Sequence, residues 1–240
     1  DNAGYLQAAG LYYELSEIME RENKDMIVNM LYVRSSLERA NESRREMEAV
    51  NVKLLKQSET DQMTGLANRY RLNAYSEKVL DYCYEHRLPL AMEILDIDFF
   101  KQYNDNYGHQ QGDECIIAIA NELKKMEDGQ TFCARYGGDE FIIIYAGISA
   151  EEVHAKAGAL RQNIMNLKLE HLYSKALPIV TISQGISYGV PEEGNRSWDF
   201  LHTADMLLYQ VKKKSRNDIC IADIRGQELD LSSKQEKVEP

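Results

Sequence analysis

The 240-residue chain has few of the residues that cross-link or kink a polypeptide: four cysteines and four prolines. Cys83, Cys115, Cys133 and Cys220 are scattered and include no CxxC pair, so we expect buried thiols and neither disulfides nor a zinc site. No apolar run approaches the roughly 18 residues that cross a bilayer, and the first residues lack the basic and apolar regions of a secretory signal. We therefore expect a cytoplasmic chain without membrane contact.

Positive charge is also in short supply. The chain has 28 lysines and arginines against 39 aspartates and glutamates, a formal charge of −11. A net acidic surface disfavours sequence-independent binding to nucleic acid, because the phosphate backbone repels it. A small phosphate ligand held by a local basic group or by a metal ion is still compatible with this charge. The 44% of apolar residues is enough for a packed core.

The first 60 residues contain no proline, and their only glycines are Gly4 and Gly10. Apolar side chains recur there at steps of three and four, which predicts amphipathic helix close to a heptad repeat. The polar stretch 20–25 separates two such stripes and could be a turn between two helices. One interpretation is a helical hairpin with one wet face; the other is a signal-relaying helix that pairs with its copy in a dimer. The stripes are Leu11, Leu15 and Ile18, followed by Met26, Met30, Val33, Leu37, Ala40, Met47, Val50 and Leu54.

The pattern changes after residue 60, where segments with helical and strand-like periodicity alternate. We expect helices near 67–86, 112–126, 150–169 and 197–213, and strands near 88–95, 131–135, 141–146, 179–188 and 219–223. Because residues 131–146 have the pattern of a hairpin, the fold class we predict is α/β (α+β), with a mixed, mainly antiparallel sheet wrapped by helices. The expected domains are a helical signalling segment (1–60), a catalytic domain (61–223) and a polar tail (224–240).

Acidic residues stand at two points beside these strands. Asp96 ends an apolar strand, where a carboxylate is costly unless it is paired or binds a cation. Asp139 and Glu140 follow a Gly-Gly pair between two apolar runs, which is typical of a hairpin turn. If the hairpin lies beside the first strand, Asp96 and Asp139 face one another and favour a divalent cation with oxygen ligands, such as magnesium or manganese. The alternative is an ordinary solvated turn.

The residues 135–141 have the sequence RYGGDEF, and this segment resembles the signature of the GGDEF family of diguanylate cyclases. Five further blocks follow the order and spacing of that family. They are Asp61–Arg69 (DQMTGLANR), Asp96–Lys101 (DIDFFK) with Asn104-Asp105, Tyr107–His109 with Gly112-Asp113, Thr181–Gly185 (TISQG), and Ala204-Asp205 through Lys212 to Arg216-Asn217. The resemblance covers about two-thirds of the chain. One departure is Ser215, which stands where the family has glycine.

The resemblance implies a fold like the polymerase palm and the class III nucleotidyl cyclases, preceded here by the helical segment. It implies a nucleotidyltransferase that condenses two GTP molecules into cyclic di-GMP and two pyrophosphates, for bacterial second-messenger signalling. Each domain would hold one GTP, so two copies would meet as a homodimer, for which the amino-terminal helices are the obvious device. The alternative is a catalytically inactive GGDEF module that serves as a receptor for GTP or cyclic di-GMP.

The same resemblance assigns roles to residues by position. Asp96, Asp139 and Glu140 are implied as catalytic residues and, with the Ile97 carbonyl, as ligands of two Mg²⁺ (or Mn²⁺) ions per GTP site; the exact role of Glu140 stays open. The implied phosphate-binding and substrate-binding residues are Phe99, Phe100, Lys101, Gly137, Gly138, Lys212 and Arg216.

Asn104 and Asp113 match the pair that reads guanine. A carboxylate accepts hydrogen bonds from guanine N1–H and N2–H, whereas adenine would face Asp113 with an acceptor. Simple helix capping is the alternative for both residues. His109 belongs to a structural element of the family, and we expect it to pack and not to catalyse.

Many family members have an inhibitory product site, RxxD, ahead of the signature. Here Asp128 and Thr131 replace the arginine and the aspartate, so we predict no product inhibition through this segment. Two further polar residues, Glu93 and Gln184, fall within apparent strands without an explanation from the sequence.

Overall fold

The computed structural model describes residues 2–57, 59–227 and 229 of the chain. It divides into two units, residues 1–57 and residues 58–240. The expected polar tail lies mostly outside the described residues, which omit 228 and 230–240. None of the described helices has an apolar stretch long enough to span a bilayer.

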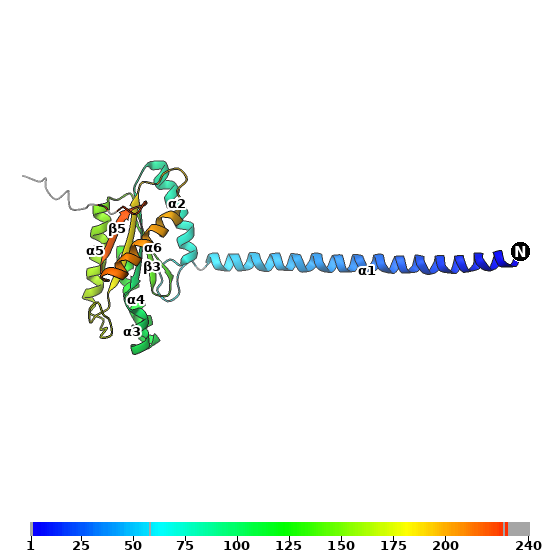
Figure 1. Ribbon diagram of the computed structural model, residues 1–240, viewed down its shortest axis with the longest axis horizontal. Coiled ribbons are helices and arrows are strands. Elements are labelled where there is room, and N and C mark those ends of the chain that lie inside the picture. Colours follow the sequence, from blue (N-terminus) through cyan, green and yellow to red (C-terminus); the bar gives the residue numbers. More distant parts are fainter. Residues whose placement is uncertain (1, 58, 228, 230–240) are drawn as a thin grey trace, which may run out of the picture. The chain divides into compact units, whose positions relative to one another are not determined.

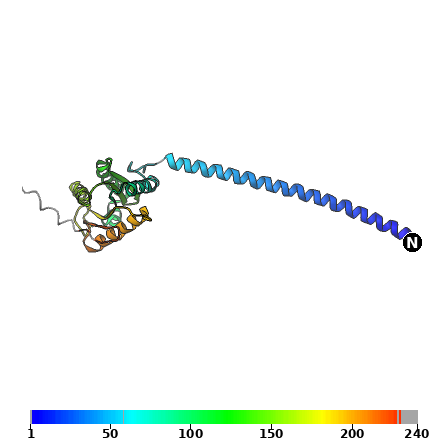
Figure 2. The same ribbon diagram turned by 90° about the horizontal axis from the view of Figure 1, so that it is seen from above.

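The first unit is a single helix, α1 (Asn2–Gln57), which Figure 2 shows without interruption. The turn expected at residues 20–25 is therefore wrong, and so is the hairpin. The stretch holds no glycine or proline, its glutamates, arginine and lysine are good helix formers, and Lys24 pairs with Glu20 one turn away at 3.0 Å. The polar residues 20–25 thus interrupt the apolar stripe without interrupting the helix.

The second unit is a five-stranded sheet with helices on both faces (Figure 1). The strands lie in the order β2-β3-β1-β4-β5, and all neighbours are antiparallel except β4 and β5. This confirms the predicted mixed, mainly antiparallel sheet. The strands are β1 (Leu90–Ile97), β2 (Thr131–Gly137), β3 (Glu140–Ala146), β4 (Ile182–Gly189) and β5 (Ile219–Asp223).

The helices divide between the two faces of the sheet and bury a separate apolar cluster on each. Helices α4 and α5 cover one face, and α2 and α6 cover the other. Cys115 and Cys133 are buried in the first cluster and Cys83 in the second, which confirms the prediction of buried thiols for these three. The helices are α2 (Arg69–His86), α3 (Phe100–Tyr107), α4 (His109–Met126), α5 (Ala150–Asn166) and α6 (Ser197–Lys214).

Local sequence explains where these helices begin and how closely they pack. Asn68 caps α2 by accepting the Arg71 N–H, and Ser149 and Glu152 form a capping box at the start of α5. Helix α6 approaches β4 so closely that a Cβ at Gly185 would lie 2.2 Å from the carbonyl oxygen of Ala204. Glycine at this position therefore lets α6 lie directly on the sheet, and α6 delivers Lys212 to the end of β1.

Candidate active site

Asp96 and Glu140 are brought together by strand pairing. Asp96 of β1 is the register partner of Glu140 at the start of β3, and directly opposed residues project to the same face of a sheet. Lys212 of α6 reaches this face, and its Nζ lies 2.7 Å from Asp96 Oδ2. The residue opposite Asp96 is thus Glu140 and not the expected Asp139, which lies in the turn that leads into β3. Three of the expected catalytic and phosphate-binding groups thus meet at one end of the sheet.

The electrostatics of this end are those of crowded acids around one ammonium group. Burial raises the pKa of Asp96 to about 6, Lys212 opposes this rise, and the charges of Asp139 and Glu140 add to it. Burial also raises the pKa of Glu140, again opposed by Lys212 and reinforced by Asp139 and Asp205. The negative charges of these carboxylates repel one another, and the single ammonium group of Lys212 neutralises only part of that charge.

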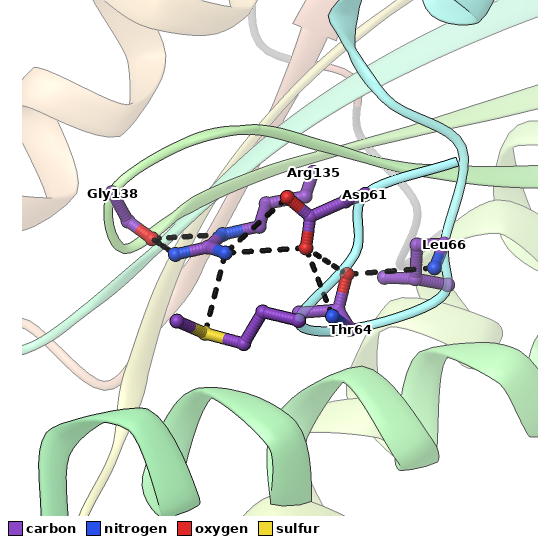
Figure 3. A network of polar contacts seen from close by, with 6 residues as sticks. Asp61, Thr64, Leu66, Arg135 and Gly138 are labelled. Carbon is purple, nitrogen blue, oxygen red and sulfur yellow. Dashed lines mark hydrogen bonds and ion pairs between the residues drawn. The ribbon is translucent and has the colours of Figure 1, made fainter. Parts of the chain in front are cut away.

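An arginine of the preceding strand holds the Gly137-Gly138 turn in place. Arg135 of β2 donates from Nε and Nη2 to the Gly138 carbonyl oxygen, at 3.1 and 2.8 Å. Figure 3 shows the same guanidinium facing Asp61, with Nη1 3.2 Å from Asp61 Oδ1 and 3.3 Å from Met63 Sδ. The Gly137-Gly138 turn is therefore tied to residues 61–63, more than seventy positions earlier in the chain.

Asp61 also shapes its own segment. Its Oδ1 accepts hydrogen bonds from the Thr64 backbone N–H and hydroxyl, at 2.9 and 2.7 Å. Burial acts to raise the pKa of Asp61, but the hydrogen bonds from Thr64 and Arg135 outweigh it and lower the pKa. The carboxylate stays ionised and can hold both the Asp61–Leu66 turn and the arginine.

Helix α3 begins beside the acids. Phe100 is its first residue, and Phe99 precedes it at φ 57° with no side chain capping the helix. Phe100 therefore opens the helix, and Phe99 occupies the position before it. Uncapped N–H groups at a helix start suit an anion, and the exposed Lys101 lies in the same turn. Phosphate contacts of Phe99, Phe100 and Lys101 stay a prediction.

Asp98 lies in the connection between β1 and α3, residues 98–99, for which the family resemblance implies phosphate contacts and which we call the phosphate loop. It is fully buried, and its oxygens accept hydrogen bonds from the Thr181 and Ser183 hydroxyls, both at 2.7 Å, and from the Asn217 N–H at 2.9 Å. Arg216 Nη1 lies 3.5 Å from Asp98, and its guanidinium stacks over the Phe99 ring at 4.3 Å. Arg216 and Lys212 therefore both point toward the end of β1.

Ser215, which stands where the family has glycine, does not adopt the left-handed backbone that favours glycine. Ser215 has φ −135°, while Arg216 and Asn217 have φ of 53° and 45°. With this backbone, Arg216 Nη1 lies 3.5 Å from Asp98 Oδ1.

The two residues expected to read the base lie close together, although they belong to different helices. Asn104 is in α3 and Asp113 is in α4, next to Gly112. A Cβ at Gly112 would lie 1.9 Å from Asn104 Oδ1, so only glycine allows this contact. Asn104 Oδ1 is buried and has no hydrogen-bond partner in the described part of the chain, while Asp113 is exposed. Polar groups are therefore available here for a ligand.

Two hollows adjoin Glu140 on the face of α6. One, of about 450 Å³, is lined by Glu140, Asp205, Lys212 and the outer residues of α6. The other, of about 680 Å³, lies between α2 and α6 and includes Arg69, Tyr136 and Trp198. Solvent and ligands can therefore reach the end of the sheet where Glu140 lies.

The donors for a metal ion at this end of the sheet are oxygen atoms. Among residues 2–57, 59–227 and 229, no three histidine, cysteine, aspartate or glutamate side chains gather as a ready-made metal site. Asp96 and Glu140 nevertheless share a face, and Ile97, whose carbonyl is the expected backbone ligand, directly follows Asp96 at the end of β1. Magnesium commonly takes one or two carboxylates together with substrate phosphates. The oxygen donors here fit an ion that binds together with a nucleotide.

Sequence reasoning gave no role to Asp98, Arg135 or Glu93. Asp98 could have been found from Thr181 and Ser183, whose alternation places two hydroxyls on one buried side of a strand. Arg135 and Asp61 both lie in recognised motifs, but the contact between them joins segments far apart in sequence. Glu93 is fully buried and accepts hydrogen bonds from the Tyr145 hydroxyl at 2.8 Å and from Gln184 Nε2 at 2.7 Å. The two unexplained polar residues are thus partners in the core.

Comparisons with known proteins agree with this fold. A family model described as "Diguanylate cyclase, GGDEF domain" matches residues 58–218. The chain is 35% identical over 163 residues to "Probable diguanylate cyclase DgcC" of Escherichia coli strain K12, which covers 67% of this chain and 42% of that protein. The chain therefore belongs to the GGDEF domain family of diguanylate cyclases. It spans less than half the length of this curated relative.

Solved structures extend the likeness into the first unit. The coiled coil and GGDEF domain of DgcB from Caulobacter crescentus, in complex with c-di-GMP, has a TM-score of 0.63 and 28% identity, covering 77% of this chain and 97% of that one. The diguanylate cyclase SiaD of Pseudomonas aeruginosa, in complex with its activator SiaC, has a TM-score of 0.61 and 25% identity, covering 92% of this chain and 81% of that one.

Proposed function

We propose that the chain is an active diguanylate cyclase, which condenses two GTP molecules into cyclic di-GMP and two pyrophosphates. The observation that supports this most is the pairing of Asp96 with Glu140 across two strands, with Lys212 2.7 Å from Asp96, at the signature turn of a cyclase family. The domain limits we propose are those predicted: 1–60 for the helical segment, 61–223 for the cyclase and 224–240 for the tail.

The reaction joins two nucleotides twice in the same way. The 3′-hydroxyl oxygen of one ribose attacks the α-phosphorus of the other GTP, the bond to the bridging oxygen of the β-phosphate breaks, and pyrophosphate leaves. Such transfers depend chiefly on positioning and on neutralising charge. Lys212 and Arg216 would hold triphosphate oxygens from one side, and the first N–H groups of α3 with Lys101 from the other.

Asp96, Asp139, Glu140 and the Ile97 carbonyl would hold two Mg²⁺ or Mn²⁺ ions at each GTP site. When bound, such ions polarise phosphoryl oxygens and lower the pKa of a coordinated hydroxyl. Glu140 has a raised pKa beside two other acids, so it could instead accept the proton of the attacking hydroxyl. Its exact role is the open part of this proposal.

Guanine would be read where α3 meets α4. Asn104 Oδ1 is buried and has no hydrogen-bond partner among the residues that the structure describes, and Asp113 follows Gly112 on the adjacent helix. A carboxylate at this place accepts from guanine N1–H and N2–H, and it would face an acceptor on adenine. Sites built on hydrogen bonds reject such mismatches strongly, so we propose GTP and not ATP as the substrate.

Two cyclase domains must meet for each condensation, and we propose that α1 pairs with its copy. Met26, Met30, Val33 and Leu37 of the predicted stripe are each more than half exposed on α1, and a helix of this kind buries such a stripe against a partner helix. The side chains of Ile18 and Leu54, which complete the stripe, lie outside the described part. Deletion of residues 1–55 should give a folded monomer of low activity, measured by analytical ultracentrifugation and turnover; full activity in that monomer would remove the role of α1.

The competing proposal is an inactive receptor of GTP or cyclic di-GMP. Incubation with GTP and Mg²⁺, followed by chromatography of the products, separates the two proposals. An enzyme yields cyclic di-GMP and pyrophosphate in a 1:2 ratio. A receptor retains nucleotide without turnover, and a chain that does neither would contradict both.

A further inference from the structure

His171 lies outside every motif that the family resemblance identified, in the loop between α5 and β4. Its side chain is fully buried, and its Nε2 lies 3.2 Å from the carbonyl oxygen of Phe99. A carbonyl oxygen can only accept, so the proton of this hydrogen bond belongs to Nε2. Burial lowers the pKa of His171, against the opposing effects of this hydrogen bond and of Asp98, so the ring is neutral near pH 7.

The backbone at Phe99 needs support. Its φ of 57° is a left-handed conformation that a bulky residue rarely adopts. Its carbonyl oxygen accepts from the Tyr103 N–H at 3.0 Å within the helix and from His171 at 3.2 Å from outside it. The Phe99 ring lies under the Arg216 guanidinium at 4.3 Å. Phe99 is thus held at its carbonyl and at its ring.

Fixing the carbonyl of Phe99 also fixes the next N–H. The Phe99 C=O and the Phe100 N–H belong to one planar trans peptide, in which the two groups point in opposite directions. When His171 and Tyr103 hold the oxygen toward the protein, the Phe100 N–H is directed away from them, at the uncapped start of α3. A change at His171 therefore acts on the donor that would face the triphosphate.

We propose that His171 is a positioning residue of the phosphate loop, which holds the Phe99–Phe100 peptide in the orientation that binds the triphosphate of GTP. This inference rests on the proposed function. His171 touches no reacting atom in this account and acts only through the peptide. Its contribution should appear as affinity for the phosphates and should leave affinity for the nucleoside unchanged.

The test compares three variants of the full chain. His171→Phe keeps an aromatic ring among Tyr103 and Tyr107 but has no donor, whereas His171→Gln keeps an N–H donor. Tyr107→Phe is the matched control, because it removes the hydroxyl that accepts the Leu172 N–H at 3.0 Å and so disturbs the same loop one residue away without touching Phe99. Melting temperatures identify any variant that fails to fold, and His171→Leu then replaces His171→Phe.

The first measurement is the dissociation constant of guanosine 5′-[α-thio]triphosphate in the presence of Mg²⁺. The second is the inhibition constant of guanosine for cyclic di-GMP formation from GTP. Loss of one hydrogen bond should weaken triphosphate binding about 3- to 10-fold in His171→Phe and leave guanosine within twofold. His171→Gln should recover most of this loss, and Tyr107→Phe should bind like the wild type. Equal weakening of guanosine and triphosphate binding, or wild-type affinity in His171→Phe, would overturn the role of His171 and leave the proposed cyclase function standing. A wild-type chain that binds no GTP would overturn the proposed function first.

Discussion

The strand β1 carries two buried carboxyl groups, three residues apart, in opposite surroundings. Glu93 faces the core, where its partners are the neutral Tyr145 hydroxyl and the Gln184 amide. Asp96 faces α6 at the end of the strand, where its partners are the Lys212 ammonium and two further acids. Burial raises the pKa of both, to about 7 for Glu93 and about 6 for Asp96. A raised pKa alone therefore does not identify the active site.

The partners make the difference. Neutral donors can satisfy a buried carboxyl group and leave it a component of the core. An incompletely compensated group of acids near a lysine, open to two hollows, is suited to bind a cation and a phosphate. We therefore propose a structural role for Glu93 and a catalytic role for Asp96, and the following substitutions test this contrast.

The largest effect should come from Asp96→Asn. Loss of a carboxylate that stabilises charge by several kcal/mol should lower kcat by about 10³-fold or more, since each 1.4 kcal/mol is tenfold. Cyclic di-GMP formation measures the rate, and circular dichroism checks the fold. Glu93→Gln is the matched control on the same strand, with activity expected within about threefold of the wild type because its contacts are confined to the core. Equal losses in the two variants would remove the contrast.

A smaller effect is expected from Lys212→Met. Removing the ammonium should weaken GTP binding about 10-fold, because a partly buried charge that contacts both Asp96 and phosphate is worth a charge-assisted hydrogen bond. Lys213→Met is the control, since Lys213 is exposed and lies over the Tyr209 ring at 5.6 Å. Titration calorimetry with a GTP analogue gives both affinities. The same affinity in both variants would place the phosphates elsewhere.

Much of the fold and of the candidate site could be predicted from the sequence. Strand periodicity predicted all five strands to within a few residues, and the signature predicted the end of the sheet where Asp96 and Glu140 meet. The pairing of Glu93 with Gln184 could not be predicted, because it depends on cross-strand register, which neither segment reveals alone. The predicted turn at residues 20–25 is wrong, because polar residues that are good helix formers do not end a helix.

The pH dependence of stability should distinguish Glu93 from surface acids. Its folded pKa of about 7 exceeds the ordinary value of 4.5, so the folded state holds a proton that the unfolded state releases. The free energy of unfolding should therefore fall as pH rises from about 4.5 to 7, by about 3 kcal/mol at most. In Glu93→Gln this contribution should be absent, giving a flatter profile in urea titrations at pH 5, 6 and 7.5. A profile as steep as that of the wild type would mean that Glu93 is already ionised in the core.

The smallest effect is expected at Asp128, a third kind of acid. It is exposed and pairs with Lys156 at 2.7 Å, and that hydrogen bond lowers its pKa to about 2. Asp128 stands where product-inhibited relatives have an arginine, so micromolar cyclic di-GMP should leave initial rates unchanged, within the error of the assay. Inhibition that Asp128→Ala alters would show that this segment binds product after all.

We propose above all that Asp96, Asp139 and Glu140 hold a divalent ion at bound GTP. Electron paramagnetic resonance of Mn²⁺ in the presence of guanosine 5′-[α-thio]triphosphate tests it directly, with wild-type, Asp96→Asn and Glu93→Gln chains side by side. We expect the signal of protein-bound Mn²⁺ in the wild type and in Glu93→Gln, and we expect this signal to be lost in Asp96→Asn. The same bound signal in all three chains would contradict it.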